Sequence, residues 1–425
     1  MQNADLIIHN AGQLVTCASS KPKRGAAMLD VGIIAGGAVA VVDGKFAGVG
    51  TSAEILAAFQ SDKTIDAEGR VVSPGFVDPH THIVYAGDRL NEFEMKIKGA
   101  DYLEILTSGG GIISTVKQTR AASTEALVER GLSRLDKMLA CGTTTVEIKT
   151  GYGLDTVAEL KMLTVIEELD KSHALDIVPT FLAAHAIPPE FRENSEAYVN
   201  LICDSMLSAA WKWFVGSDFH GRGPFFCDVF CEKGAFTLAQ SKKILETAKS
   251  LGFKLKAHVD QFTNLGGSRL AIAMGSVSID HLDAISDEEI ALLAKSDTIG
   301  MVIPTENFNA GKTEFANARK LIDSGCAVAL STDYNPGSAP CPSQPMAMAI
   351  ACRYQKLSPA EALNAATINA AFAIGSDKAG SIEIGKSADM LMLDSKDYRA
   401  IAYEFGGNLV KDVIKKGVPA VLGRI

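Results

Sequence analysis

The sequence predicts an α/β protein, namely a (β/α)8 TIM-like barrel with a small β-sandwich domain built from both termini. Eight short apolar, β-branched segments recur along the middle of the chain, and helix-like segments separate most of them. Both ends of the chain instead have the pattern of strands and turns. Eight strand–helix units in about 300 residues fit a closed barrel. A doubly wound sheet is the alternative, but no Gly-x-Gly-x-x-Gly follows a predicted strand.

The two ends of the chain are each too short to bury a core alone, so we expect them to pair into one β domain. Strand-like segments are found at Ala4–His9, Gly37–Val42, Lys45–Gly50, Gly380–Asp394 and Leu409–Leu422. The predicted division therefore assigns residues 1–70 and 376–425 to the β domain and residues 71–375 to the barrel.

The eight barrel strands are expected at Val71–Val77, Thr143–Ile148, Ile177–Leu182, Asp228–Cys231, Lys254–His258, Ser276–His281, Thr298–Ile303 and Ala327–Ser331. Pro74 and Gly75 interrupt the first, which predicts a kink. Ser123 is expected to cap one helix at its start and Gly252 to end another. The link between the first two strands is longer than one helix needs, and its glycine-rich segment Ser108–Ile112 suits a substrate loop.

Composition excludes several classes of function. The net charge of −9 argues against a nucleic-acid partner. No apolar run approaches the ~18 residues of a membrane span, and the first residues lack the pattern of a signal peptide. The eight cysteines are scattered, which is typical of reduced, buried thiols. The sequence thus predicts a cytoplasmic protein without a membrane partner.

Polar residues gather where the predicted strands end, and this is where barrels carry their active sites. Five of the eight histidines follow such strands. The strand-end residues are His80, His82, His185, His258, His281 and Asp333. The other three histidines lie away from strand ends, and we interpret them as structural.

His80 and His82 lie two residues apart on an extended chain, so their side chains point the same way. With His258 and Asp333 they supply three imidazoles and a carboxylate, which suits one zinc or iron ion with a position open for water. A bound metal lowers the pKa of water to about 7. Asp333 can then take the proton. His281 is expected to stabilise the oxyanion or pass protons, with a supporting role behind the ligands as the alternative.

The sequence resembles the amidohydrolase superfamily over its whole length. The matching segments are Pro74–His82, the histidines at 258 and 281, and Ser331–Asp333. More narrowly, it resembles the imidazolonepropionase family in His82–Arg89, Gly142–Leu154, Phe181–His185 and Asp333–Ser338.

This resemblance implies that water opens the ring of 4-imidazolone-5-propanoate to give N-formimidoyl-L-glutamate, the third step of histidine degradation. It implies one metal ion per subunit, held by His80, His82, His258 and Asp333, and a homodimer. It also implies which residues contact the substrate or lie near the amino-acid end of the product: Arg89, Tyr152, His185, Asn335, Gly337 and Ser338.

Chemistry agrees with these assignments. A guanidinium binds the carboxylate of such a substrate with two hydrogen bonds. Tyr152 lies between two glycines, so we expect it to be exposed at the barrel rim. His185 can donate to the ring carbonyl as charge develops there.

Two positions depart from the wider superfamily. Binuclear relatives bridge their metals with a carboxylated lysine; we interpret Lys149 as unmodified and the site as mononuclear. Some relatives carry a glutamate where this chain has Gln261, which can hydrogen-bond the ring but cannot act as a base. Two alternatives stay open, a purine-type aminohydrolase and a scaffold that has lost catalysis.

Overall fold

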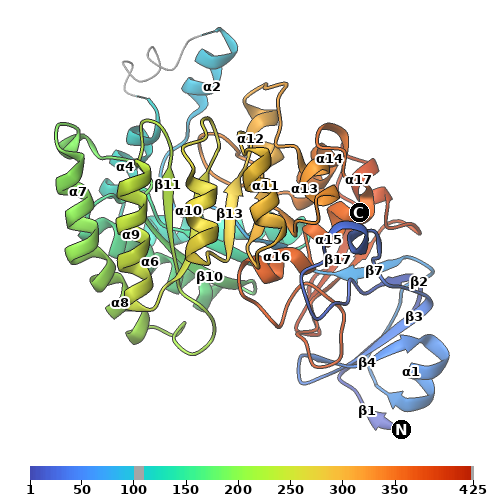
Figure 1. The fold of residues 1–425 in the computed structure, drawn as a ribbon. Helices are drawn as coiled ribbons and strands as arrows, with labels where there is room; N and C mark the ends of the chain where they lie inside the picture. The colour runs from blue at the N-terminus through green and yellow to red at the C-terminus, as the bar shows by residue number, and fades with distance from the viewer. Residues whose placement is uncertain (100–109, 423–425) are drawn as a thin grey trace.

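The computed structural model describes residues 1–99 and 110–422. Its centre is a barrel of eight parallel strands, which follow one another around the sheet in sequence order (Figure 1). The strands are β8 (Phe76–Asp78), β9 (Thr143–Lys149), β10 (Asp176–Ala184), β11 (Phe226–Cys231), β12 (Lys254–Val259), β13 (Ser278–His281), β14 (Ile299–Val302) and β15 (Val328–Leu330). The predicted barrel is thereby confirmed.

The segment predicted as one first strand, Val71–Val77, is two strands. β7 (Val71–Pro74) pairs with terminal strands, whereas β8 pairs with β9 in the barrel. Gly75 joins them, and a Cβ there would lie 2.2 Å from the Thr144 hydroxyl. The chain therefore passes from one sheet to the other at a residue with no room for a side chain. The change of sheet between β7 and β8 thus falls at Gly75.

Polar side chains close the seam of the barrel between β8 and β15. The Gln344 amide lies 3.1 Å from the Val77 carbonyl and 3.4 Å from the Leu330 carbonyl, one on each strand. Ser331 donates to the Asp78 carboxylate at 2.6 Å. The first and last strands are thus joined next to the residues that follow them.

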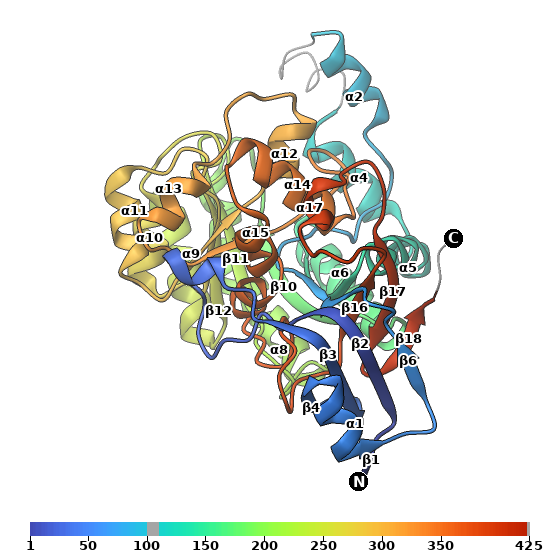
Figure 2. The ribbon, with the colours of Figure 1, turned by 90° about the vertical axis from the view of Figure 1, so that its right-hand side faces the viewer.

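The β domain is built from both termini, as predicted (Figure 2). Its sheet has the order β18-β17-β16-β7-β2-β3-β4, and β6 pairs with β2. These strands are β2 (Leu6–Val15), β3 (Ile33–Val42), β4 (Lys45–Thr51), β6 (Thr64–Asp66), β16 (Met390–Leu393), β17 (Val410–Lys415) and β18 (Val418–Val421). The two-residue strands β1 (Gln2–Asn3) and β5 (Phe59–Gln60) pair separately. Ile8, Phe46, Met390 and Ile414 share one buried apolar cluster, so each end completes the core of the other.

Helices separate the barrel strands and extend both domains. The α-helices are α1 (Ser52–Ala58), α2 (Leu90–Ile97), α4 (Ile112–Ala121), α5 (Thr124–Ala140), α6 (Thr156–Ser172), α7 (Ser195–Leu201), α8 (Leu207–Gly216), α9 (Leu238–Leu251), α10 (Gly267–Met274), α11 (Asp287–Ala294), α12 (Pro304–Asn309), α13 (Ala318–Asp323), α14 (Gln344–Tyr354), α15 (Pro359–Ala365), α16 (Ile368–Ala373) and α17 (Ala400–Tyr403). Ser123 caps α5 and Gly252 ends α9, which confirms both predictions. Of the predicted substrate loop, Ser108 and Gly109 lie outside the described residues, and Ile112 begins α4.

Within the described ranges, no helix combines the length and the apolar character needed to cross a membrane. None of the eight cysteines, all of which lie in the described ranges, forms a disulfide; five are buried as predicted, whereas Cys141, Cys341 and Cys352 are partly exposed.

Candidate metal and substrate site

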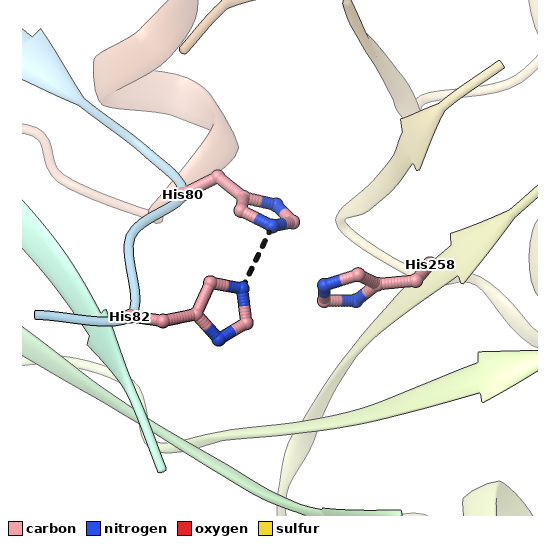
Figure 3. A group of neighbouring side chains, drawn as sticks. All are labelled: His80, His82 and His258. Atoms are coloured by element: carbon pink, nitrogen blue, oxygen red, sulfur yellow. Dashed lines mark hydrogen bonds between the residues drawn. The ribbon is translucent and has the colours of Figure 1, made fainter. Parts of the chain in front are cut away.

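Three histidines converge at the carboxyl ends of the barrel strands (Figure 3). His80 and His82 follow β8, and His258 lies on β12. The Nε2 atoms of His80 and His82 are 3.2 Å apart, and the His80 and His258 ring centroids are 4.4 Å apart. One carboxylate oxygen of Asp333 lies 3.5 Å from both Nε2 atoms. The structure thus brings together all four residues predicted as metal ligands.

The chemistry of these donors fits a cation. His80 Nδ1 lies 2.7 Å from the Asp280 carboxylate, and His258 Nδ1 lies 3.0 Å from that of Asp228. A carboxylate accepts, so His80 Nδ1 carries the proton and its Nε2 keeps a lone pair. Both ring nitrogens of His258 are buried without a hydrogen-bond partner among the described residues. Lone pairs converging on one buried space repel each other unless a cation lies between them.

Burial also holds these imidazoles in the form that binds metal. Desolvation, followed by nearby cationic groups, lowers the pKa of His80 well below its usual value. Desolvation and the neighbouring His185 do the same to the pKa of His82. Both rings are therefore neutral near pH 7, and neutral imidazole is the ligand for zinc and for iron.

A buried ionic network lies inside the barrel beside these histidines. Lys149 Nζ lies 2.7 Å from Asp228, 3.0 Å from Glu147 and 3.7 Å from Asp280. Burial lowers the pKa of Lys149, but the three carboxylates outweigh burial and raise it above the usual range. The amine is therefore charged. This state favours the interpretation of Lys149 as unmodified, because carboxylation requires a neutral amine.

Asp333 and His281 both have left-handed backbone conformations at the cavity, with φ of 50° and 85°. Burial, and then the Glu306 carboxylate, raise the pKa of Asp333 well above its usual value. The His281 ring centroid lies 5.2 Å from that of His258, and its buried Nδ1 has no partner in the part of the chain that the structure describes. Both residues are thus placed for proton transfer near the predicted ligands.

A cavity opens over this group. Every residue predicted to contact the substrate lines it: Arg89, Tyr152, His185, Gln261, Asn335, Gly337 and Ser338. His82, His258, His281 and Asp333 line it too. Ile112, the last residue of the predicted substrate loop, lines the cavity as well, and so does Phe230, which was not predicted. Phe230 lies on β11, so the strand-end rule would have found it had apolar side chains been considered.

The prediction that Tyr152 is exposed at the barrel rim is wrong, because the residue is only 4% exposed. Its ring centroid lies 6.0 Å from that of His82 and 5.4 Å from that of His185. The glycines on either side let the backbone pass close to neighbouring groups, so the loop folds inward. A Cβ at Gly151 would lie 2.8 Å from His185, and one at Gly153 would lie 2.5 Å from the Glu159 backbone nitrogen.

His185 stacks on His82, with ring centroids 4.9 Å apart and planes 15° apart. Its Nδ1 lies 3.0 Å from the Gly151 carbonyl oxygen. Burial, and then the neighbouring His258 ring, lower the pKa of His185 to about 3. The ring is therefore neutral, and its environment favours an accepting Nε2 over the donor role expected from the sequence.

Arg89 lies on the other side of the cavity. Its Nε donates to Glu92 at 2.8 Å, and its Nη1 donates to Thr115 at 3.3 Å. A Cβ at Gly337 would lie 2.8 Å from Arg89 Nη2, so this glycine makes room for the guanidinium. Asn335 Oδ1 accepts from the backbone nitrogens of Gly337 and Ser338 at 2.8 Å each, which shapes the adjoining wall.

Comparisons with known proteins agree with this geometry. Two models described as "Amidohydrolase family" match residues 63–100 and 232–420. The chain is 52% identical to an "Imidazolonepropionase" of Herpetosiphon aurantiacus over 98% of this chain and 97% of that protein. It is 50% identical to one of Chloroflexus aggregans over 98% of each.

Solved structures share the fold. An adenosine deaminase from Xanthomonas campestris with bound zinc superposes with a TM-score of 0.74 at 20% identity, covering 100% of this chain and 94% of that one. Guanine deaminase of E. coli gives a TM-score of 0.73 at 14% identity and covers 99% of each chain.

Proposed function

The chain belongs to the imidazolonepropionase family of amidohydrolases, and we propose how the residues around its cavity carry out the reaction. It is a hydrolase that cleaves the cyclic amide C–N bond of 4-imidazolone-5-propanoate to give N-formimidoyl-L-glutamate. We assign this reaction to the third step of histidine degradation.

His80, His82, His258 and Asp333 would hold a divalent metal. The ion would be zinc or iron, one per subunit, because three imidazoles and a carboxylate suit either. When bound, the ion acts as a Lewis acid that polarises a carbonyl and lowers the pKa of water to about 7. The charged Lys149 stays unmodified and neutralises Asp228, so the site is mononuclear.

Asp333 accepts the proton of the attacking water. Its carboxylate oxygen lies 3.5 Å from the Nε2 atoms of His80 and His82, so it adjoins the centre where water is activated and can take the proton. The proton then passes to the leaving nitrogen, with Asp333 and the adjacent His281 as the donors within the cavity. Gln261 cannot take this role and hydrogen-bonds the ring.

Arg89 binds the propanoate carboxylate of the substrate, and Tyr152 and His185 contact the substrate beside the metal ligands. Asn335, Gly337 and Ser338 surround the amino-acid end of the product. An arginine fork pairs with a carboxylate through two hydrogen bonds and so fixes its orientation. Orientation of this kind brings the ring carbonyl to the centre where water is activated.

One observation carries this proposal: Arg89 lines the same cavity as three of the four predicted metal ligands, His82, His258 and Asp333. A purine has no carboxylate for Arg89, which disfavours a purine-type aminohydrolase. Loss of the ultraviolet absorbance of 4-imidazolone-5-propanoate measures turnover. The metal-loaded enzyme should consume this compound and leave guanine and adenosine unchanged; absence of turnover would contradict the proposal.

The scaffold alternative predicts a folded protein that purifies without metal. Metal analysis of the purified enzyme should instead give about one zinc or iron per chain, in line with a single three-histidine, one-carboxylate site. The homodimer and the cytoplasmic location stay predictions. Light scattering tests the first and cell fractionation tests the second.

A further inference from the structure

Glu159, which the proposed reaction does not use, holds the loop that carries Tyr152. It lies in the first turn of α6 and is 1% exposed. One of its oxygens accepts from the backbone nitrogens of Gly153 and Leu154, at 2.8 Å each. The other accepts from the backbone nitrogen of Gly151 at 3.2 Å. One carboxylate thus satisfies three backbone donors of a single short loop.

The carbonyl side of the same loop is held as well. Arg120 Nε donates to the Gly153 carbonyl at 2.6 Å and lies 3.0 Å from the Asp155 carboxylate. Buried backbone donors left without a partner are costly, so this loop keeps its shape only while Glu159 accepts all three bonds.

The loop reaches the site through the Gly151 carbonyl, which lies 3.0 Å from His185 Nδ1. A carbonyl only accepts, so Nδ1 is the nitrogen that carries a proton in this contact. The fit is close, because Gly151 has a φ of 107° and a Cβ there would lie 2.8 Å from Nδ1. The position of one loop carbonyl therefore decides which tautomer His185 adopts.

We propose that Glu159 is a positioning residue: it fixes the loop so that the Gly151 carbonyl keeps the His185 proton on Nδ1 and leaves Nε2 as a hydrogen-bond acceptor for the substrate. A cyclic amide offers an N–H beside its carbonyl, and this is the group that an accepting imidazole nitrogen recognises. The inference rests on the proposed function for the identity of that substrate, but the tautomer belongs to the free enzyme.

The first test measures the tautomer directly. Enzyme labelled with ¹⁵N-histidine and loaded with zinc should give a His185 signal with Nδ1 protonated and Nε2 bare; His185→Gln identifies that signal by removing it. A proton on Nε2, or on both nitrogens, would overturn the proposal.

The second test removes part of the hydrogen bonding between Glu159 and the loop. Glu159→Gln replaces an acceptor oxygen by an amide that cannot accept from the loop, so at least one donor loses its partner. We expect KM for 4-imidazolone-5-propanoate to rise about tenfold, metal content to stay unchanged and the His185 signal to move toward a mixture of tautomers. Wild-type KM together with the wild-type His185 signal would refute the role.

Glu361→Gln is the matched control. Glu361 is also a buried glutamate in the first turn of a helix, α15, but its partners are Ser358 and Arg319. Glu361→Gln should leave KM and the His185 signal as in wild type.

Gly151→Ala perturbs the contact between the Gly151 carbonyl and His185 directly and should reproduce the rise in KM. This variant covers the case that Glu159→Gln fails to fold. If the wild-type enzyme does not turn over the substrate, the proposed function fails while the tautomer measurement still decides this inference.

Discussion

The metal half of the cavity and its substrate half are held in place by different means. Asp280 and Asp228 orient His80 and His258 from inside the barrel, and Lys149 lies between these two carboxylates. All of these side chains are buried and come from the barrel strands or the segment directly after β8. Such a group can move only if the barrel itself deforms.

The substrate half depends on loops. Tyr152 lies in a loop whose backbone is hydrogen-bonded to Glu159. Arg89 directly precedes α2, and its guanidinium is held by Glu92 on α2 and Thr115 on α4. A few hydrogen bonds to loop backbone or to neighbouring helices decide these positions. We therefore expect substitutions in the metal half to lower metal content and substitutions in the substrate half to lower substrate affinity.

Removal of a metal ligand should have the largest effect. In His258→Ala one of the three converging imidazoles is lost, so we expect metal content to fall and kcat/KM to drop about a thousandfold or more. Metal analysis and the ultraviolet assay measure the two effects. His173→Ala is the control, because His173 lies at the end of α6 outside the cavity. Retained metal and activity in His258→Ala would disprove the ligand assignment.

Asp228→Asn tests the support behind that ligand. The neutral amide removes the negative charge that lies 3.0 Å from His258 Nδ1 and 2.7 Å from Lys149 Nζ, so the imidazole loses its electrostatic support. We expect metal affinity to fall about 10- to 100-fold with KM little changed. Competition with a chelator measures the affinity. Asp389→Asn, a buried carboxylate paired with Lys415 far from the metal half, should bind metal normally.

Arg89→Ala probes the substrate half. Loss of a charged hydrogen-bonding group should raise KM about 10- to 100-fold while the metal content stays at the wild-type level. Arg89→Lys keeps the charge but not the planar fork, so its KM should lie between those of wild type and Arg89→Ala. A wild-type KM in Arg89→Ala would remove Arg89 from the substrate site, and loss of metal would show that the two halves are not independent.

The metal half could be predicted from the sequence because its geometry follows from the strands. A parallel barrel brings all strand ends to one rim, so His82, His258 and Asp333 meet although they lie far apart in the chain. The supporting residues Asp228 and Lys149 lie inside the barrel, on strands whose positions were predicted correctly.

The substrate half could be predicted only in part, because loop conformation depends on distant partners. The sequence around Tyr152 gives no sign that Glu159, on the next helix, would draw the loop inward and bury the ring. Pro74 and Gly75 predict a kink in the first strand, but not that β7 pairs in the other sheet, since the pairing of β7 with β16 joins residues more than 300 positions apart.

Gly337→Ala should have the smallest effect, and it separates contact from position within the substrate half. The new methyl group would meet Arg89 Nη2 at 2.8 Å, the far end of a flexible side chain that can shift at little cost. We expect KM to rise only a few-fold, because the fork is displaced but not lost. Gly406→Ala, where a Cβ meets no described atom within 4 Å, is the control. A KM as high as that of Arg89→Ala would mean that the angle of the fork, more than its charge, decides substrate affinity. An unchanged KM would contradict the expected displacement and mean that the bonds of Arg89 to Glu92 and Thr115 keep the fork in its productive position.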